Sequence, residues 1–466
     1  MFTALSVRGR GAARLAVTAL VAGLFAAGSL ASAGPVAAED IPQHQGGVSA
    51  TLDGLTTFDR AVLHDGGQRH ELPAGLFEMT VDGGGRLKTY CIDIHNPTQE
   101  QAKYLETPWD QTSLGANSGA GKIRWILQHS YPQVDDLTAL AERAGTGPLT
   151  ERTAAAGTQV AIWRYSDGAE VEALDPAAEE LADWLEKKAK SVEEPRASLS
   201  LEPNAVSGKA GGRLGPVTVR TDADGVTVTP PLDSAASGVI VTDEAGKPVT
   251  TAADGSRLYF DVPAGATDGT AALSLQATTN VPVGRAFSGV TKSQTQILAG
   301  SSRSTVSATA TATWATKGPI PALTAEKNCA GGGIDITATN RGDAKFTFEL
   351  QGLKHAIAPG ESRTVTVPVP EDQAYDFTIT GPGGFSKSFK GVLDCRTTGS
   401  VGPVTDEPEP QPSAASAGGT ALDENLAATG ASGATPIIAG VAIGLVVVGG
   451  AAVLFVRRKK APSTED

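Results

Sequence analysis

The chain contains only three cysteines, and one of them has no natural partner. Cys329 and Cys395 flank a β-patterned segment near the C-terminus, so we expect them to form a structural disulfide. Cys91 lies far upstream in the string Tyr90-Cys91-Ile92-Asp93-Ile94. An unpaired cysteine outside the cell would be a reactive thiol, a buried small side chain or part of another covalent bond. The role of Cys91 therefore constrains both the fold and the function.

The two ends of the chain predict an exported and anchored protein. A basic stretch, an apolar run and the small-residue site Ala31-Ser32-Ala33 are typical of a signal peptide over 1–33, with cleavage possible as late as 38. The uncharged apolar run 437–456 is long enough to cross a membrane, and the basic segment 457–466 is the expected cytoplasmic tail. The residues between these segments are expected outside the cell, where a disulfide is stable.

Length and charge limit the remaining possibilities. A chain of 466 residues with 55 glycines and 28 prolines has room for about three domains and flexible connections. Its net charge is −13 and its exported part has no basic cluster. Nucleic acid is therefore not an expected partner.

The segment 47–192 predicts a mixed α+β domain. Two strand-like runs, 76–81 and 87–94, are separated by turn residues at 82–85, and strand alternation would put Cys91 and Asp93 on one face. Helices are predicted at 123–129, 137–144, 154–165 and 176–188. Gln159 would then project from a helix towards the interior, while Trp163 is expected to pack in the core.

The remaining exported residues predict β structure and a spacer. Frequent turns and alternating apolar residues favour two antiparallel, immunoglobulin-like β-sandwiches, at 196–317 and at 320–396, the second pinned by the disulfide. Residues 397–425 are rich in Pro, Glu, Ser, Gly and Ala and are expected to form a flexible spacer.

A cysteine and a glutamine can form a thioester. Attack of the sulfur on the glutamine amide expels ammonia and leaves an activated acyl group, provided that the fold orients the two groups and stabilises the oxyanion. Asp93 and His95 are candidates for moving the protons.

The two strings around Cys91 and Gln159 resemble a known family. The chain from about residue 47 to 190 is similar to the thioester domains of Gram-positive surface adhesins, and closely to the Cys-Gln thioester-forming (TQxA) surface proteins of actinobacteria. Tyr90-Cys91-Ile92-Asp93 matches the string that supplies the cysteine, and Thr158-Gln159-Val160-Ala161 the one that supplies the glutamine. The resemblance implies a thioester between Cys91 and Gln159 and covalent capture of an amine-bearing target surface.

The C-terminal end resembles a sortase sorting signal. The LAxTG-type motif, formed by Leu426, Ala427, Ala428, Thr429 and Gly430, precedes the apolar span and the basic tail. The resemblance implies cleavage after Thr429 and transfer to the cell wall, with sortase and peptidoglycan as partners. The alternative is a plain single-span membrane anchor.

These observations predict a wall-anchored adhesin that is not an enzyme and needs no cofactor. One alternative is a structural surface protein in which the Cys91–Gln159 bond only stiffens the domain. Another is a secreted cysteine hydrolase pairing Cys91 with His95 or His129. A metal site is not expected, because the spacing of His64, His70, Cys91 and His95 matches no standard ligand pattern.

Overall fold

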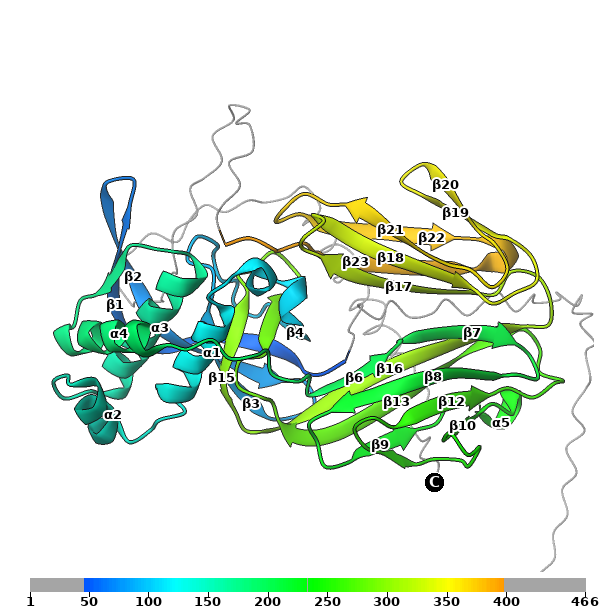
Figure 1. Ribbon diagram of the computed structural model, residues 1–466, viewed down its shortest axis with the longest axis horizontal. Helices are drawn as coiled ribbons and strands as arrows, with labels where there is room; N and C mark the ends of the chain where they lie inside the picture. The colour runs from blue at the N-terminus through cyan, green and yellow to red at the C-terminus, as the bar shows by residue number, and fades with distance from the viewer. Residues whose placement is uncertain (1–45, 233, 398–466) are drawn as a thin grey trace, which may run out of the picture. The chain divides into compact units, whose positions relative to one another are not determined.

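The computed structural model describes residues 46–232 and 234–397 (Figure 1). The predicted signal peptide, spacer, sorting motif, membrane span and tail lie outside this range. Among the described residues, no helix has the length and apolar character needed to cross a membrane.

The first part of the fold is a seven-stranded antiparallel sheet with the order β2-β3-β15-β14-β4-β1-β5. β1 also pairs with β2. This pairing closes six of the strands into a circuit with the order β1-β2-β3-β15-β14-β4. The strands are β1 (Ser49–Asp65), β2 (Gln68–Val81), β3 (Arg86–Cys91), β4 (Lys103–Thr107), β5 (Val171–Ala173), β14 (Ala286–Gly289) and β15 (Gln296–Ser301).

The predicted hairpin before Cys91 is confirmed, but its second strand is shorter than expected. β2 and β3 pair across the turn at 82–85, and β3 ends at Cys91 instead of continuing to residue 94. The carboxylate of Asp93 accepts hydrogen bonds from the main-chain N–H groups of His95 and Asn96, at 3.2 and 3.3 Å. Because this local turn competes with the strand ladder, the chain leaves the sheet just after Cys91. Asp93 is therefore in a turn and not on the strand.

Four helices accompany this sheet, and all four predicted helices are present. They are α1 (Ala120–His129), α2 (Leu137–Ala144), α3 (Glu151–Ser166) and α4 (Pro176–Lys188), with short 3-10 turns η1 (Trp109–Gln111) and η2 (Ser113–Ala116). Figure 1 shows them gathered beside β1 and β2. α3 begins three residues earlier than predicted, because Thr150 and Thr153 form a reciprocal capping box.

α3 is the central helix of this region, since every residue from Thr153 to Trp163 is buried. Its small residues allow close packing. A side chain at Gly157 would come within 2.3 Å of the main-chain oxygen of Ala178 in α4. Gly157 therefore fits a helix interior here despite its low helix propensity, because it lets α4 approach.

The middle part of the fold consists of a four-stranded sheet, β10-β12-β8-β6, and a five-stranded sheet, β11-β9-β13-β16-β7. Side chains from both sheets, such as Phe260 and Leu275, belong to one buried cluster. The elements are β6 (Leu199–Glu202), β7 (Ala205–Lys209), β8 (Arg213–Thr221), β9 (Val226–Thr229), α5 (Ser234–Ser237), β10 (Ile240–Thr242), β11 (Thr251–Ala252), β12 (Arg257–Asp261), β13 (Gly269–Asn280) and β16 (Arg303–Ala315). The immunoglobulin-like topology stays a prediction.

The segment between β13 and β16 does not belong to these two sheets. The prediction of one sandwich over 196–317 is wrong here, because β14 and β15 insert between β3 and β4 of the first sheet. Arg285, just before β14, donates to Glu106 of β4 at 2.9 Å, and both side chains are buried. We call residues 46–192 together with β14 and β15 the thioester region.

The last part of the described chain is a small β domain with its own hydrophobic cluster. A disulfide joins Cys329 and Cys395 near its two ends, and we call residues 320–396 the disulfide domain. Its strands are β17 (Pro321–Asn328), β18 (Gly333–Asn340), β19 (Phe346–Leu350), β20 (Leu353–Ile357), β21 (Ser362–Pro368), β22 (Ala374–Thr380) and β23 (Ser386–Val392), with the 3-10 turn η3 (Pro382–Gly384).

Candidate functional site

Cys91 and Gln159 lie against each other inside the thioester region. Cys91 is the last residue of β3, and Gln159 projects from the middle of α3. The main-chain N–H of Cys91 donates to Oε1 of Gln159 at 3.1 Å, and Nε2 of Gln159 donates to the main-chain oxygen of Cys91 at 2.9 Å. These two bonds fix the orientation of the amide, because only its oxygen can accept from the N–H.

The pair is enclosed by protein. The exposed fraction is 2% for Cys91 and 0% for Gln159. Burial raises the pKa of the Cys91 thiol far above its ordinary value, and the charge of Asp167 raises it further. A free thiolate is therefore costly in this geometry, and loss of the thiol proton must accompany attack on the amide.

Trp163 contributes a polar contact as well as a buried ring. It lies one turn after Gln159 on α3, and its indole Nε1–H donates to Sγ of Cys91 at 3.1 Å. The prediction that this residue only packs the core is incomplete, because the indole also supplies the sulfur with a hydrogen-bond donor. Such a donor favours negative charge on sulfur.

Two carboxyl groups lie near enough to Cys91 for their charges to act on its thiol: Asp93, two residues further along the chain, and Asp167, which is distant in the chain. Burial raises the pKa of Asp93 to about 7. Asp167, at the end of α3, was not identified from the sequence; burial raises its pKa well above the ordinary value. Its Oδ1 accepts from the N–H of Ile94 at 3.1 Å, which ties the end of α3 to the segment after Cys91.

His95 is not arranged like a proton carrier for Cys91. Its side chain is exposed, and its main-chain N–H, not its ring, donates a hydrogen bond to Asp93. His129 is also engaged elsewhere, because its Nδ1 contacts the main-chain oxygen of Trp125 at 2.8 Å and its ring stacks on the Trp125 indole. Neither histidine supports the cysteine-hydrolase alternative.

The side chains of the metal site that the sequence disfavours have other surroundings. His64 lies near the end of β1 and contacts Glu172 at 3.1 Å, and the exposed His70 lies on β2. Sγ of Cys91 instead contacts Trp163 and, at 3.6 Å, the main-chain oxygen of Asp93.

A glutamine from the distant strand β15 lies opposite Cys91. Gln296 pairs with Cys91 across the antiparallel ladder, so the two side chains are on the same face of the sheet. Its Oε1 accepts from Thr89 at 3.0 Å, whereas its buried Nε2 has no hydrogen-bond partner among the described residues. Nothing in the local sequence around Gln296 identifies this position, because only the insertion of β15 brings it to Cys91.

Two family models match parts of the chain. Residues 88–191 match the thioester domain family, and residues 320–392 match the C-terminal domain of bacterial phospholipase C. The first match contains Cys91, Gln159, Trp163 and Asp167. The second coincides with most of the disulfide domain. No curated protein matches the chain.

Solved structures also align with the chain at low similarity. The Bacillus anthracis TIE protein is 12% identical, with a TM-score of 0.27, and the alignment covers 75% of this chain and 81% of that one. The thioester domain of the Enterococcus faecium TIE86 protein is 14% identical, with a TM-score of 0.27, over 58% of this chain and 97% of that one. TM-scores this low do not establish a common fold over the aligned lengths.

The family match and the contact between Cys91 and Gln159 concern the same residues. The match begins within β3 and ends after α4, so it includes the strand and the helix that carry the pair. The chain therefore contains a thioester domain, matched over residues 88–191.

Proposed function

We propose that Cys91 and Gln159 form an internal thioester that captures an amine on a target surface. One observation carries this proposal: the Gln159 amide is held at both ends by the main chain of Cys91, inside a buried site. Such fixed proximity can supply roughly 7 to 11 kcal/mol of the barrier to reaction between two groups.

The bond forms by self-processing. Sγ of Cys91 attacks Cδ of Gln159, the bond between Cδ and Nε2 breaks, and the thiol proton leaves with Nε2 as part of ammonia. The Cys91 N–H already donates to Oε1 at 3.1 Å, so it can stabilise the negative charge that develops on this oxygen. The Trp163 indole N–H can stabilise the sulfur as it loses its proton.

In the capture reaction the sulfur of Cys91 is the leaving group, whereas it is the nucleophile when the thioester forms. The nitrogen of an incoming amine attacks the thioester carbonyl, forms an amide with the Gln159 acyl group and releases Cys91 as a thiol. Because the thioester is consumed, each molecule reacts once. On this proposal the protein is a single-use covalent adhesin and not an enzyme with turnover.

The predicted ends of the chain complete the proposal. Sortase would cleave after Thr429 and attach the protein to peptidoglycan, leaving the thioester region displayed outside the cell. The resemblance to the thioester domains of Gram-positive surface adhesins, together with the match of residues 88–191 to the thioester domain family, supports this location. The proposed target is an amine-bearing surface.

The structural alternative also has an observation in its favour. Cys91 and Gln159 are almost completely buried, and a buried thioester would resist both water and amines. In that case the bond would only cross-link β3 to α3. The two functions therefore differ in whether an amine can reach the bond.

Treatment of the purified protein with methylamine distinguishes them. For an adhesin, we expect a starting mass one ammonia below the sequence mass, a gain of one methylamine at Gln159 and a newly alkylatable Cys91. Cys91→Ala should show neither the deficit nor the gain. A deficit that persists in methylamine would favour the structural cross-link, and a full starting mass would refute both.

A further inference from the structure

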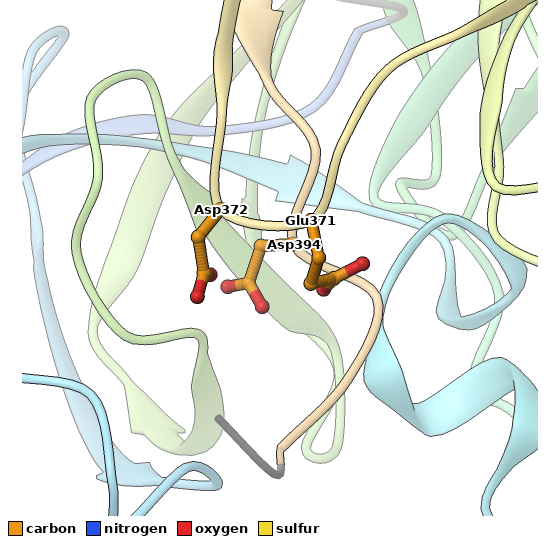
Figure 2. A group of neighbouring side chains, drawn as sticks. All are labelled: Glu371, Asp372 and Asp394. Atoms are coloured by element: carbon orange, nitrogen blue, oxygen red, sulfur yellow. The ribbon is translucent and has the colours of Figure 1, made fainter. Parts of the chain in front are cut away.

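A group of three carboxylates lies at one end of the disulfide domain, outside the thioester site. Glu371 and Asp372 are in the turn between β21 and β22, and Asp394 follows β23 (Figure 2). One carboxylate oxygen from each residue lies within 4.8 Å of the other two. In Figure 2 the Asp394 carboxylate lies between those of Asp372 and Glu371.

The second observation is an unsatisfied buried oxygen. Asp394 is only 7% exposed, and its Oδ2 accepts from Thr295 Oγ1 at 2.6 Å. Its Oδ1 is buried and has no hydrogen-bond partner among the described residues. A buried carboxylate oxygen without a donor is costly, so a ligand that fills its coordination would stabilise this arrangement.

The local charges also favour a cation. Lys327 is a basic residue whose charge acts on both Asp394 and Glu371, but one lysine balances at most one of the three carboxylates. Glu371 Oε1 accepts from the main-chain N–H of Arg396 at 2.8 Å and from that of Cys395. These bonds hold the Glu371 side chain in place.

We propose that Glu371, Asp372 and Asp394 bind a calcium ion. Calcium prefers oxygen ligands at about 2.3 to 2.6 Å, so two ligands of one ion can lie up to about 5 Å apart, which accommodates the observed cluster. Its flexible coordination suits ligands from irregular backbone, with water or main-chain oxygens completing the shell. Magnesium demands a smaller and more regular octahedron.

A hydrogen bond connects the proposed calcium site to the residue that precedes β15, the strand that lies opposite Cys91. Thr295, whose hydroxyl donates to Asp394, precedes Gln296 at the start of β15, and its main-chain oxygen accepts from the N–H of Ile92 at 3.1 Å. A bound ion would fix the Asp394 carboxylate in the orientation that accepts from Thr295. Calcium would therefore strengthen the connection between the disulfide domain and the thioester region.

Asp372→Asn is the most informative variant. Asp372 has a φ of 56°, a left-handed conformation that asparagine also adopts readily. The substitution therefore removes a charged ligand while keeping the backbone preference. Glu349→Gln is a matched control, because Glu349 is an exposed carboxylate on β19 of the same domain.

The test is titration of the purified, chelator-treated protein with calcium chloride, followed by calorimetry and by thermal unfolding. We expect binding at roughly 0.1 to 1 mM, the range of many extracellular calcium modules, with a higher unfolding temperature of the disulfide domain. Glu349→Gln should respond like the wild type, and Asp372→Asn should bind at least about tenfold more weakly. An unchanged response in Asp372→Asn, or no response in either assay up to roughly 10 mM, would overturn the proposal.

Discussion

Cys91 at the end of β3 lies directly opposite Gln296 at the start of β15. β3 comes before the helices of the thioester region, whereas β15 comes after most of the middle β strands. The strand that carries Cys91 is thus paired on both sides, with β2 and with β15. A segment that ends near residue 190 lacks one of these neighbours.

Truncation should therefore prevent thioester formation. We expect residues 46–195 alone to expose the edges of β3 and β4 and to aggregate or remain partly unfolded. Residues 46–317 contain β14 and β15 and should retain a mass one ammonia below the sequence value. Intact mass spectrometry and circular dichroism of both segments check this. A stable 46–195 segment with the ammonia deficit would contradict the account.

Removing the indole donor should slow formation of the bond. Trp163→Phe keeps a large aromatic ring but loses the N–H that contacts Sγ at 3.1 Å. A hydrogen bond to a charged group contributes roughly 1.5 to 3 kcal/mol, so the rate should fall about 10-fold to 150-fold. Loss of ammonia during refolding measures the rate, and Trp184→Phe on α4 is the control. Equal rates for the two variants would exclude this role of Trp163.

We also expect Nε2 of Gln296, which has no hydrogen-bond partner among the described residues, to assist the reaction. Thr89→Val with Gln296→Leu removes both members of their hydrogen bond, so the effect on stability should be small. If Nε2 stabilises the developing oxyanion, the rate of ammonia loss should fall about a hundredfold. Thr89→Val alone, which leaves the Gln296 amide present, should form the thioester at close to the wild-type rate. A double variant as fast as Thr89→Val would assign Gln296 a packing role.

The sequence predicts which residues form the site, Cys91 and Gln159, but it does not predict the surrounding contacts as well. The strings around Cys91 and Gln159 identify the pair because both lie in locally recognisable elements, a hairpin strand and a helix. Strand alternation continued past Cys91 predicts that Asp93 lies on the strand face, whereas its carboxylate forms a turn with the following N–H groups. A local turn overrode the strand pattern.

The features that the sequence does not predict, the position of Gln296 and the carboxylate cluster, depend on contacts between residues that are far apart in the chain. Gln296 reaches Cys91 only because β15 leaves the middle β region, and alternation within 286–301 fits either sheet equally well. The carboxylate cluster likewise joins Asp394 to Glu371 and Asp372 across two strands of the disulfide domain. Neither the pairing partner of a strand nor the approach of distant carboxylates follows from local spacing.

The raised pKa of Asp93 predicts a pH dependence of stability. Burial raises this pKa to about 7, so between about pH 4 and pH 7 the folded protein binds this proton more tightly than the unfolded chain. The contribution of Asp93 to the free energy of unfolding therefore falls as pH rises through this window. Asp93→Asn, which resembles the protonated group, should reduce the difference between urea unfolding at pH 5 and at pH 7. An unchanged difference would contradict this assignment.

The most direct test of the central claim is a peptide map of the purified protein under conditions that preserve thioesters. We predict a cross-linked pair of peptides that contains Cys91 and Gln159 and is one ammonia lighter than their sum, and its absence in Cys91→Ala. Unmodified Gln159 together with a freely alkylated Cys91 after denaturation would contradict the thioester.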